Sequence, residues 1–79
     1  MSERNALEML EWRTKVGRAF RRYVKGLDDA VRDETLDELA DLLGRGVATV
    51  KNWAEGETVP PAPAAEALER ELVKRGISV

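Results

Sequence analysis

The segment TLDELADLLGRGVATVKNW, residues 35–53, constrains the fold of this 79-residue chain more than any other stretch. The apolar residues of its first half recur at steps of three and four positions: Leu36, Leu39, Ala40 and Leu43. This spacing predicts the buried face of a helix, and Gly44 supplies the left-handed residue that ends it. A second helix is predicted over about residues 47–54, with Val50 and Trp53 facing inward. Because so few residues join the two helices, the second must cross the first.

The residues on either side of this segment predict where its helices begin and end. Thr35 and Glu38 have the spacing of a capping box, in which each side chain satisfies a free backbone amide at the start of a helix. Residues 26–34, GLDDAVRDE, are therefore predicted to be a connector, with or without one helical turn. Gly56 is predicted to end the second helix, and GETVPPAP, residues 56–63, is predicted to be a loop stiffened by its prolines.

Helices are also predicted at both ends of the chain. An apolar stripe runs along the N-terminal half: Met9, Trp12, Val16, Ala19, Phe20, Tyr23 and Leu27. It predicts a basic helix over residues 13–26, while residues 1–12 form either an N-terminal arm or a short helix. A C-terminal helix is predicted over residues 62–75, with Pro63 in its first turn and Gly76 after its end. Two pairs of opposite charge on that helix have i, i+4 spacing: Glu66–Arg70 and Glu71–Arg75.

No segment has the alternating pattern of a strand, so the sequence predicts an all-α fold. The length allows a single domain over residues 1–79. We expect a compact bundle of four to five short helices that contains a helix-turn-helix at residues 35–55.

The composition makes catalysis and metal binding improbable. The chain has no cysteine and no histidine, and its serines are Ser2 and Ser78, near the termini. Nucleophilic and histidine-based catalysis therefore lack their usual groups, and no thiolate metal site can form. We expect a protein that is not an enzyme and that needs no cofactor or metal.

The hydropathy pattern argues against a membrane protein. No apolar run approaches the ~18–20 residues that a membrane span needs. The N-terminus, MSERNALEML, carries charges where a signal peptide has an apolar core. We expect a cytoplasmic protein without a membrane partner.

The charges are strongly segregated along the chain although the net charge is only −2. Residues 12–26 contain six basic residues and no acidic one, and residues 27–43 contain seven acidic residues and one basic one. Residues 44–53 add Arg45 and Lys51, again without an acid. A polyanion responds to the local field of one face, not to the net charge. The basic residues are therefore compatible with nucleic-acid binding, and a solvated helix face is the alternative interpretation.

From Leu36 onward the chain resembles the lambda-repressor-like (Xre-type) family of helix-turn-helix DNA-binding domains. The residues that carry the likeness are LDELADLLG, TVKNW, Gly56 and Pro60. Ala40 matches the small residue where the two helices cross, and Gly44 matches the glycine of the turn. Val50 and Trp53 match the two buried positions of the recognition helix.

Two positions depart from the family pattern. Arg45 stands where the family usually has an inward apolar residue, and Gly46 stands where it usually has a Ser, Thr or Pro cap. An open alternative is that Val47 turns inward to replace the apolar contact. In that case the second helix is shifted, and the residues that contact bases change by about one position.

The resemblance implies that the second helix, about residues 47–54, enters the major groove of double-stranded DNA. The base-contacting residues that it implies are Val47, Ala48, Lys51 and Asn52. Asn suits adenine, Lys suits guanine, and small apolar side chains pack on thymine methyl groups. The candidate phosphate contacts are Arg18, Arg21, Arg22, Lys25, Arg45, Thr49 and Thr58. The alternative for Lys51 and Asn52 is again a solvated helix surface.

Two functions from different classes follow from these residues. The first is a small bacterial or phage transcriptional regulator that binds DNA by sequence. We expect it to act as a homodimer, because a single module offers little contact area. The second is a protein-interaction module on the same fold, such as an antitoxin or a polymerase-binding inhibitor, that uses its acidic surface over residues 28–41. The first depends on Lys51 and Asn52, and the second depends on the acids.

Overall fold

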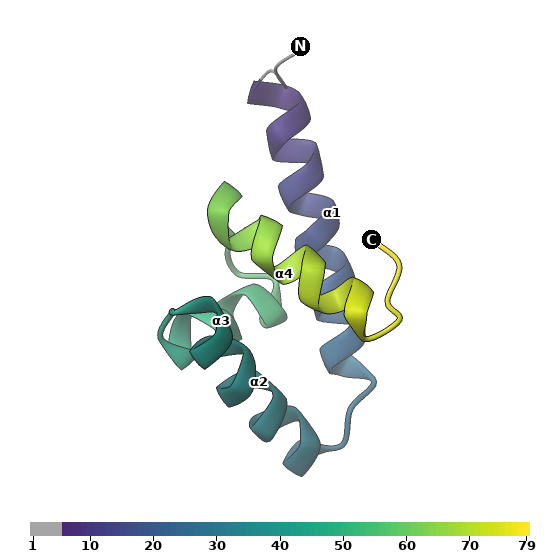
Figure 1. Cartoon of the computed structure of the whole chain (residues 1–79), viewed down its shortest axis with the longest axis vertical. Helices are drawn as coiled ribbons and strands as arrows, with labels where there is room; N and C mark the ends of the chain where they lie inside the picture. Colours follow the sequence, from purple (N-terminus) through teal and green to yellow (C-terminus); the bar gives the residue numbers. More distant parts are fainter. Residues whose placement is uncertain (1–5) are drawn as a thin grey trace.

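The computed structural model describes residues 6–79, which form four helices (Figure 1). They are α1 (Ala6–Lys25), α2 (Asp29–Leu43), α3 (Val47–Glu55) and α4 (Ala62–Lys74). No strand occurs among the described residues. The predicted all-α fold is therefore confirmed for this part of the chain.

Helix α1 is the longest element, and both α3 and α4 pack on it (Figure 1). Helix α2 packs on α3 and, less extensively, on α4. All four helices contribute to one core, and its fully buried large side chains are Val16, Phe20, Leu39, Val50, Pro60, Leu68 and Leu72. Each large apolar side chain that is removed from water stabilises the fold by ~1.5–3 kcal/mol. The core therefore holds α3 against α1 and α2.

The predicted helix ends at glycines are confirmed by the backbone. Gly44, Gly56 and Gly76 have φ angles of 65°, 79° and 80°. After each glycine, the next amide donates to the carbonyl five residues before it: Arg45 to Ala40 (3.0 Å), Glu57 to Asn52 (3.0 Å) and Ile77 to Leu72 (2.9 Å). These hydrogen bonds are those of the Schellman motif. The turn between α2 and α3 is thus fixed by the backbone.

Helix α1 is continuous from residue 6, so residues 6–12 are neither an arm nor a separate helix. Residues 1–5 of the predicted N-terminal segment lie outside the described part of the chain. The first turns of α1 extend beyond the other three helices (Figure 1). Further along, Gly17 faces the loop after α3, and a Cβ there would meet Pro60 Cδ at 3.4 Å, an ordinary contact distance. Arg13 Nε fixes the same loop by donating to the Pro60 carbonyl at 2.8 Å.

The two tryptophans pack into the fold. Trp53 is buried, and Trp12 is partly buried against the core. The Trp12 Nε1 atom also donates to Glu69 Oε2 of α4 at 3.2 Å. The predicted apolar stripe of α1 missed Val24, which is buried at its edge.

The predicted start of α2 is wrong. The helix begins at Asp29, with Asp28 at its N-cap, so most of the predicted connector is helical. Thr35 lies inside the helix with 6% of its surface exposed, and it cannot act as a cap. The physical reason is that nothing between residues 28 and 35 interrupts a helix, and burial of Thr35 among the helices favours continuation over a new start.

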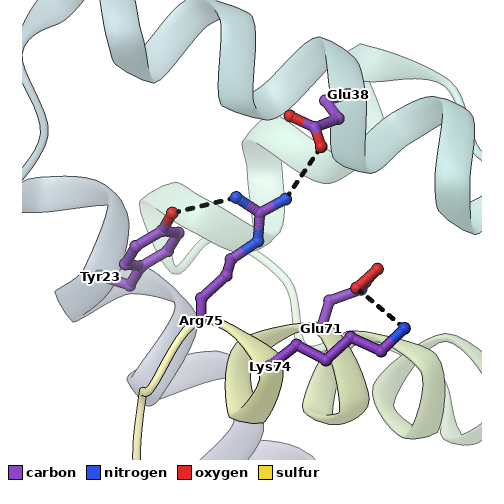
Figure 2. A network of polar contacts seen from close by, with 5 residues as sticks. All are labelled: Tyr23, Glu38, Glu71, Lys74 and Arg75. Carbon is purple, nitrogen blue, oxygen red and sulfur yellow. Dashed lines mark hydrogen bonds and ion pairs between the residues drawn. The ribbon is translucent and has the colours of Figure 1, made fainter.

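Arg75 joins three helices at the end of α4 (Figure 2). Its guanidinium donates to the Tyr23 hydroxyl of α1 (3.3 Å) and to Glu38 Oε1 of α2 (3.2 Å). The predicted Glu66–Arg70 pair is confirmed at 3.0 Å. The predicted Glu71–Arg75 pair is wrong, because Arg75 reaches across to α2 and Glu71 pairs with Lys74 instead (3.8 Å).

Candidate nucleic-acid interface

Helix α3 has one buried side and one exposed side. Val50, Trp53 and Ala54 are buried in the core. The four residues predicted to contact bases are all exposed and form what we call the outer face of α3: Val47, Ala48, Lys51 and Asn52. Residues three or four positions apart are neighbours on a helix surface, so Lys51 lies beside Val47 and Ala48, and Asn52 lies beside Ala48. The structure therefore brings these four side chains together on a helix that the core holds rigidly.

Val47 does not turn inward, since 46% of its surface is exposed. Leu43, the last residue of α2, packs against the core from the other side of the turn. Arg45, like Val47, is exposed. The alternative in which α3 is rotated by about one residue is not supported.

The N-terminus of α3 is open. Gly46 occupies the N-cap in an extended conformation (φ −66°, ψ 145°) and provides no side-chain cap. Residues 44–49 are all exposed. The first amides of a helix lack intrahelical acceptors and carry the positive end of the helix dipole. This end of α3 therefore favours negatively charged groups, and it lies beside Val47 and Ala48.

Two hollows flank α3. The larger, which we call the cationic groove, has a volume of about 430 Å³ and is lined by Arg21, Val24, Lys25, Arg32, Asp33, Leu36, Lys51, Ala54 and Glu55. The smaller, about 180 Å³, is lined by Thr14, Gly17, Arg18, Arg21, Trp53, Gly56, Thr58 and Val59. Arg21 lines both, and its guanidinium lies against Gly56, where a Cβ would be 3.1 Å from Nη1. The basic side of α1 thus borders the second half of α3.

The predicted phosphate contacts divide between these hollows and other surfaces. Arg21 and Lys25 line the cationic groove, and Arg18, Arg21 and Thr58 line the smaller hollow. Arg45 and Thr49 are exposed near the start of α3 and line neither hollow. Arg22 points elsewhere, because its guanidinium donates to the Ser78 carbonyl at 3.4 Å. Arg22 is thus the one predicted contact that the described structure places at the C-terminal tail.

Sequence reasoning missed three charged residues of the cationic groove: Arg32, Asp33 and Glu55. Arg32 and Asp33 were assigned to a connector, but they belong to the second turn of α2. The spacing of Arg32 and Asp33 from Leu36 is the feature of the sequence that could have identified them. A residue three or four positions before an inward leucine shares its side of the helix, so a helix extended back past Thr35 predicts both.

Three cations of this surface lack the ion pairs that several other cations of the described chain make. Arg70, Lys74 and Arg75 pair with acids, and Arg32 pairs with Asp29. Among the described residues, no ion pair or hydrogen bond is found for the side chains of Arg21, Lys25 and Lys51. Unpaired cations near one groove create a locally positive potential in a chain of net charge −2.

Within the described residues, no helix has the length and apolarity to cross a membrane. Over residues 6–79, no cluster of acidic side chains has an arrangement that could hold a metal ion. No family model matches the chain, and no curated protein or solved structure shows significant similarity to it.

Proposed function

We propose that this protein binds double-stranded DNA by inserting α3 into the major groove. The observation that carries the proposal is the outer face of α3: four exposed side chains of base-contacting types on a helix whose opposite side is fixed in the core. In this proposal the protein is a small bacterial or phage transcriptional regulator. It acts by occupying a DNA site, without catalysis and without a cofactor.

The outer face offers chemistry that distinguishes base pairs. The Asn52 amide suits bidentate contact with adenine N6 and N7, and the Lys51 ammonium suits guanine O6 or N7. Val47 and Ala48 can pack on thymine methyl groups. Each good bidentate contact discriminates by ~1–3 kcal/mol. The open N-terminus of α3 is compatible with a nearby phosphate.

The surroundings of α3 support contacts to the DNA backbone. Arg18, Arg21 and Lys25 lie on the side of α1 that borders α3, and Thr58 lies in the loop that follows it. Arg45 and Thr49 flank the start of the helix. Such contacts position a protein on DNA but do not read its sequence. Because one small module buries only ~600–1,000 Å² on DNA, we propose that the chain binds as a homodimer on two half-sites.

Fluorescence anisotropy with a labelled duplex of mixed sequence tests DNA binding directly. The wild-type affinity is expected to fall linearly on a log–log plot as salt rises, with a slope of about −0.9 per phosphate neutralised. A Lys74→Ala variant, on α4 away from both hollows, is the control for loss of one positive charge. Absence of any duplex binding at low salt would refute the proposal.

The second candidate function is binding of a basic protein partner. It is favoured by the exposed acids at the start of α2, which begins six residues before the predicted start at Thr35. These acids are the N-cap Asp28 and, in the first two turns, Asp29, Asp33 and Glu34. Replacing these acids by their amides would then abolish partner capture, and Lys51→Ala/Asn52→Ala would leave it unchanged. DNA binding predicts the reverse dependence on the two surfaces.

A further inference from the structure

We infer that the cationic groove is a phosphate-binding site, and that in the DNA complex it receives a phosphodiester of the strand beside α3. The inference that the phosphate belongs to DNA rests on the proposed function, whereas the inference that the groove binds phosphate rests on the residues of the groove alone. Four basic residues from three helices line this hollow: Arg21 and Lys25 from α1, Arg32 from α2 and Lys51 from α3. Arg32 is paired with Asp29, so Arg21, Lys25 and Lys51 supply the cations without an ion pair among the described residues.

The groove combines exposed cations with a partly apolar floor. Its floor contains Val24 and Leu36, both only 4% exposed, and Ala54, which is 7% exposed. Low-dielectric walls strengthen the attraction between a bound anion and the cations around it. The volume of about 430 Å³ exceeds many times the ~30 Å³ that one water molecule occupies, so a phosphate group has room to enter.

Two acidic residues of the groove limit where an anion can bind. Asp33 and Glu55 line it together with the four cations, and their repulsion opposes an anion placed near them. A phosphate is therefore expected nearest Arg21 and Lys25 of α1, since Glu55 lies one turn from Lys51 on α3. Neutralising Asp33 is expected to tighten binding of phosphate groups by about 2- to 5-fold at low salt, since like charges repel most when screening is weak.

Lys51 links the groove to the outer face of α3, because it belongs to both. A phosphate held in the groove would fix the depth and register of α3 against the base pairs. Arg32 enters the groove only because α2 begins at Asp29. The early start of α2 thus supplies a wall that a helix beginning at Thr35 would lack.

Lys25→Gln compared with Lys15→Gln tests the inference. Both lysines are exposed on α1 and have no ion pair among the described residues, but only Lys25 lines the groove. The full chain is titrated with a mixed-sequence duplex and, separately, with inorganic phosphate against chloride at constant ionic strength. Amide chemical shifts are followed at Val24, Leu36 and Ala54.

Both probes are expected to shift the groove amides. Lys25→Gln should weaken duplex binding about 3- to 10-fold and lower the salt slope by about one, and Lys15→Gln should do neither. Duplex binding that leaves the groove amides unmoved, or that both variants weaken equally, would overturn the inference while DNA binding stands. Shifts induced by phosphate without any duplex binding would support the groove as a phosphate site and would refute the inference that the phosphate belongs to DNA. The absence of shifts with either probe would overturn it entirely.

Discussion

Gly44 and Gly17 show how the same residue type serves two different purposes in this chain. Gly44 has a φ of 65° and open space around its Cβ position, so its role is purely conformational. Gly17 lies within α1, where its missing Cβ leaves room for Pro60 at ordinary contact distance, 3.4 Å. The turn before α3 therefore depends on the backbone freedom of Gly44, whereas α1 does not require that freedom at Gly17.

Substitution by alanine should accordingly have opposite effects at the two glycines. Gly44→Ala is expected to lower the free energy of unfolding by ~1–2 kcal/mol, the cost of a left-handed L-residue. Gly17→Ala is expected to raise it by up to ~1 kcal/mol, because alanine favours the helix. Urea unfolding followed by circular dichroism measures both. Equal destabilisation by the two variants would contradict these roles.

At the scale of elements, the sequence predicted helix ends better than helix starts. Gly44, Gly56 and Gly76 end helices through local backbone geometry, so their effect can be recognised from sequence. The Thr35–Glu38 pattern was misleading, because a start signal can also occur inside a helix that tertiary burial prolongs. The residues of the outer face of α3 were predicted from the resemblance to helix-turn-helix domains, and all four are exposed. The cationic groove was not, since Arg32 and Asp33 depend on the true start of α2.

Glu34→Pro tests the early start of α2. Residue 34 is exposed and lies within the helix, where proline costs ~3 kcal/mol. The same substitution in a connector would be nearly neutral. Glu34→Ala is the matched control and should change stability by less than ~0.5 kcal/mol. Urea unfolding that shows Glu34→Pro to be as stable as Glu34→Ala would mean that the segment is not helical.

At the scale of the whole molecule, Arg75 connects the end of α4 to α1 and α2 (Figure 2). Burial lowers the pKa of Arg75, but the hydrogen bond to Tyr23 and the charges of Tyr23 and Glu38 together raise it above its ordinary value. A raised pKa of a cation means that its stabilising contribution is complete below the unfolded-state value and is lost only as pH rises through the folded-state value. The stabilisation that Arg75 provides therefore does not change with pH near neutrality.

Arg75→Ala should lower the free energy of unfolding by ~0.5–1 kcal/mol, a modest effect because Glu38 is largely exposed. The loss should be the same at about pH 6 and pH 9, where arginine stays charged. Arg70→Ala, which removes an exposed pair on one helix, should cost no more than ~0.5 kcal/mol. Thermal unfolding at both pH values provides the comparison. A loss at Arg75 that differs between the two pH values would contradict the assignment.

The distribution of charge gives the molecule two contrasting surfaces. Unpaired cations border α3, and exposed acids cover the first turns of α2. A basic surface alone binds any duplex, so salt-dependent affinity does not distinguish readout of sequence from general attraction. The decisive property is whether the outer face of α3 selects particular base pairs.

Selection from a randomised duplex library tests that property most directly. The wild-type protein and the Lys51→Ala/Asn52→Ala variant are used at low salt, with Lys74→Ala as the control for charge. The proposal predicts that the wild type and Lys74→Ala enrich one common motif, with half-sites about one helical turn apart if the protein dimerises. The double variant should lose the motif while retaining some binding to any duplex. Enrichment of no motif by the wild type, or of the same motif by the double variant, would contradict base recognition by α3.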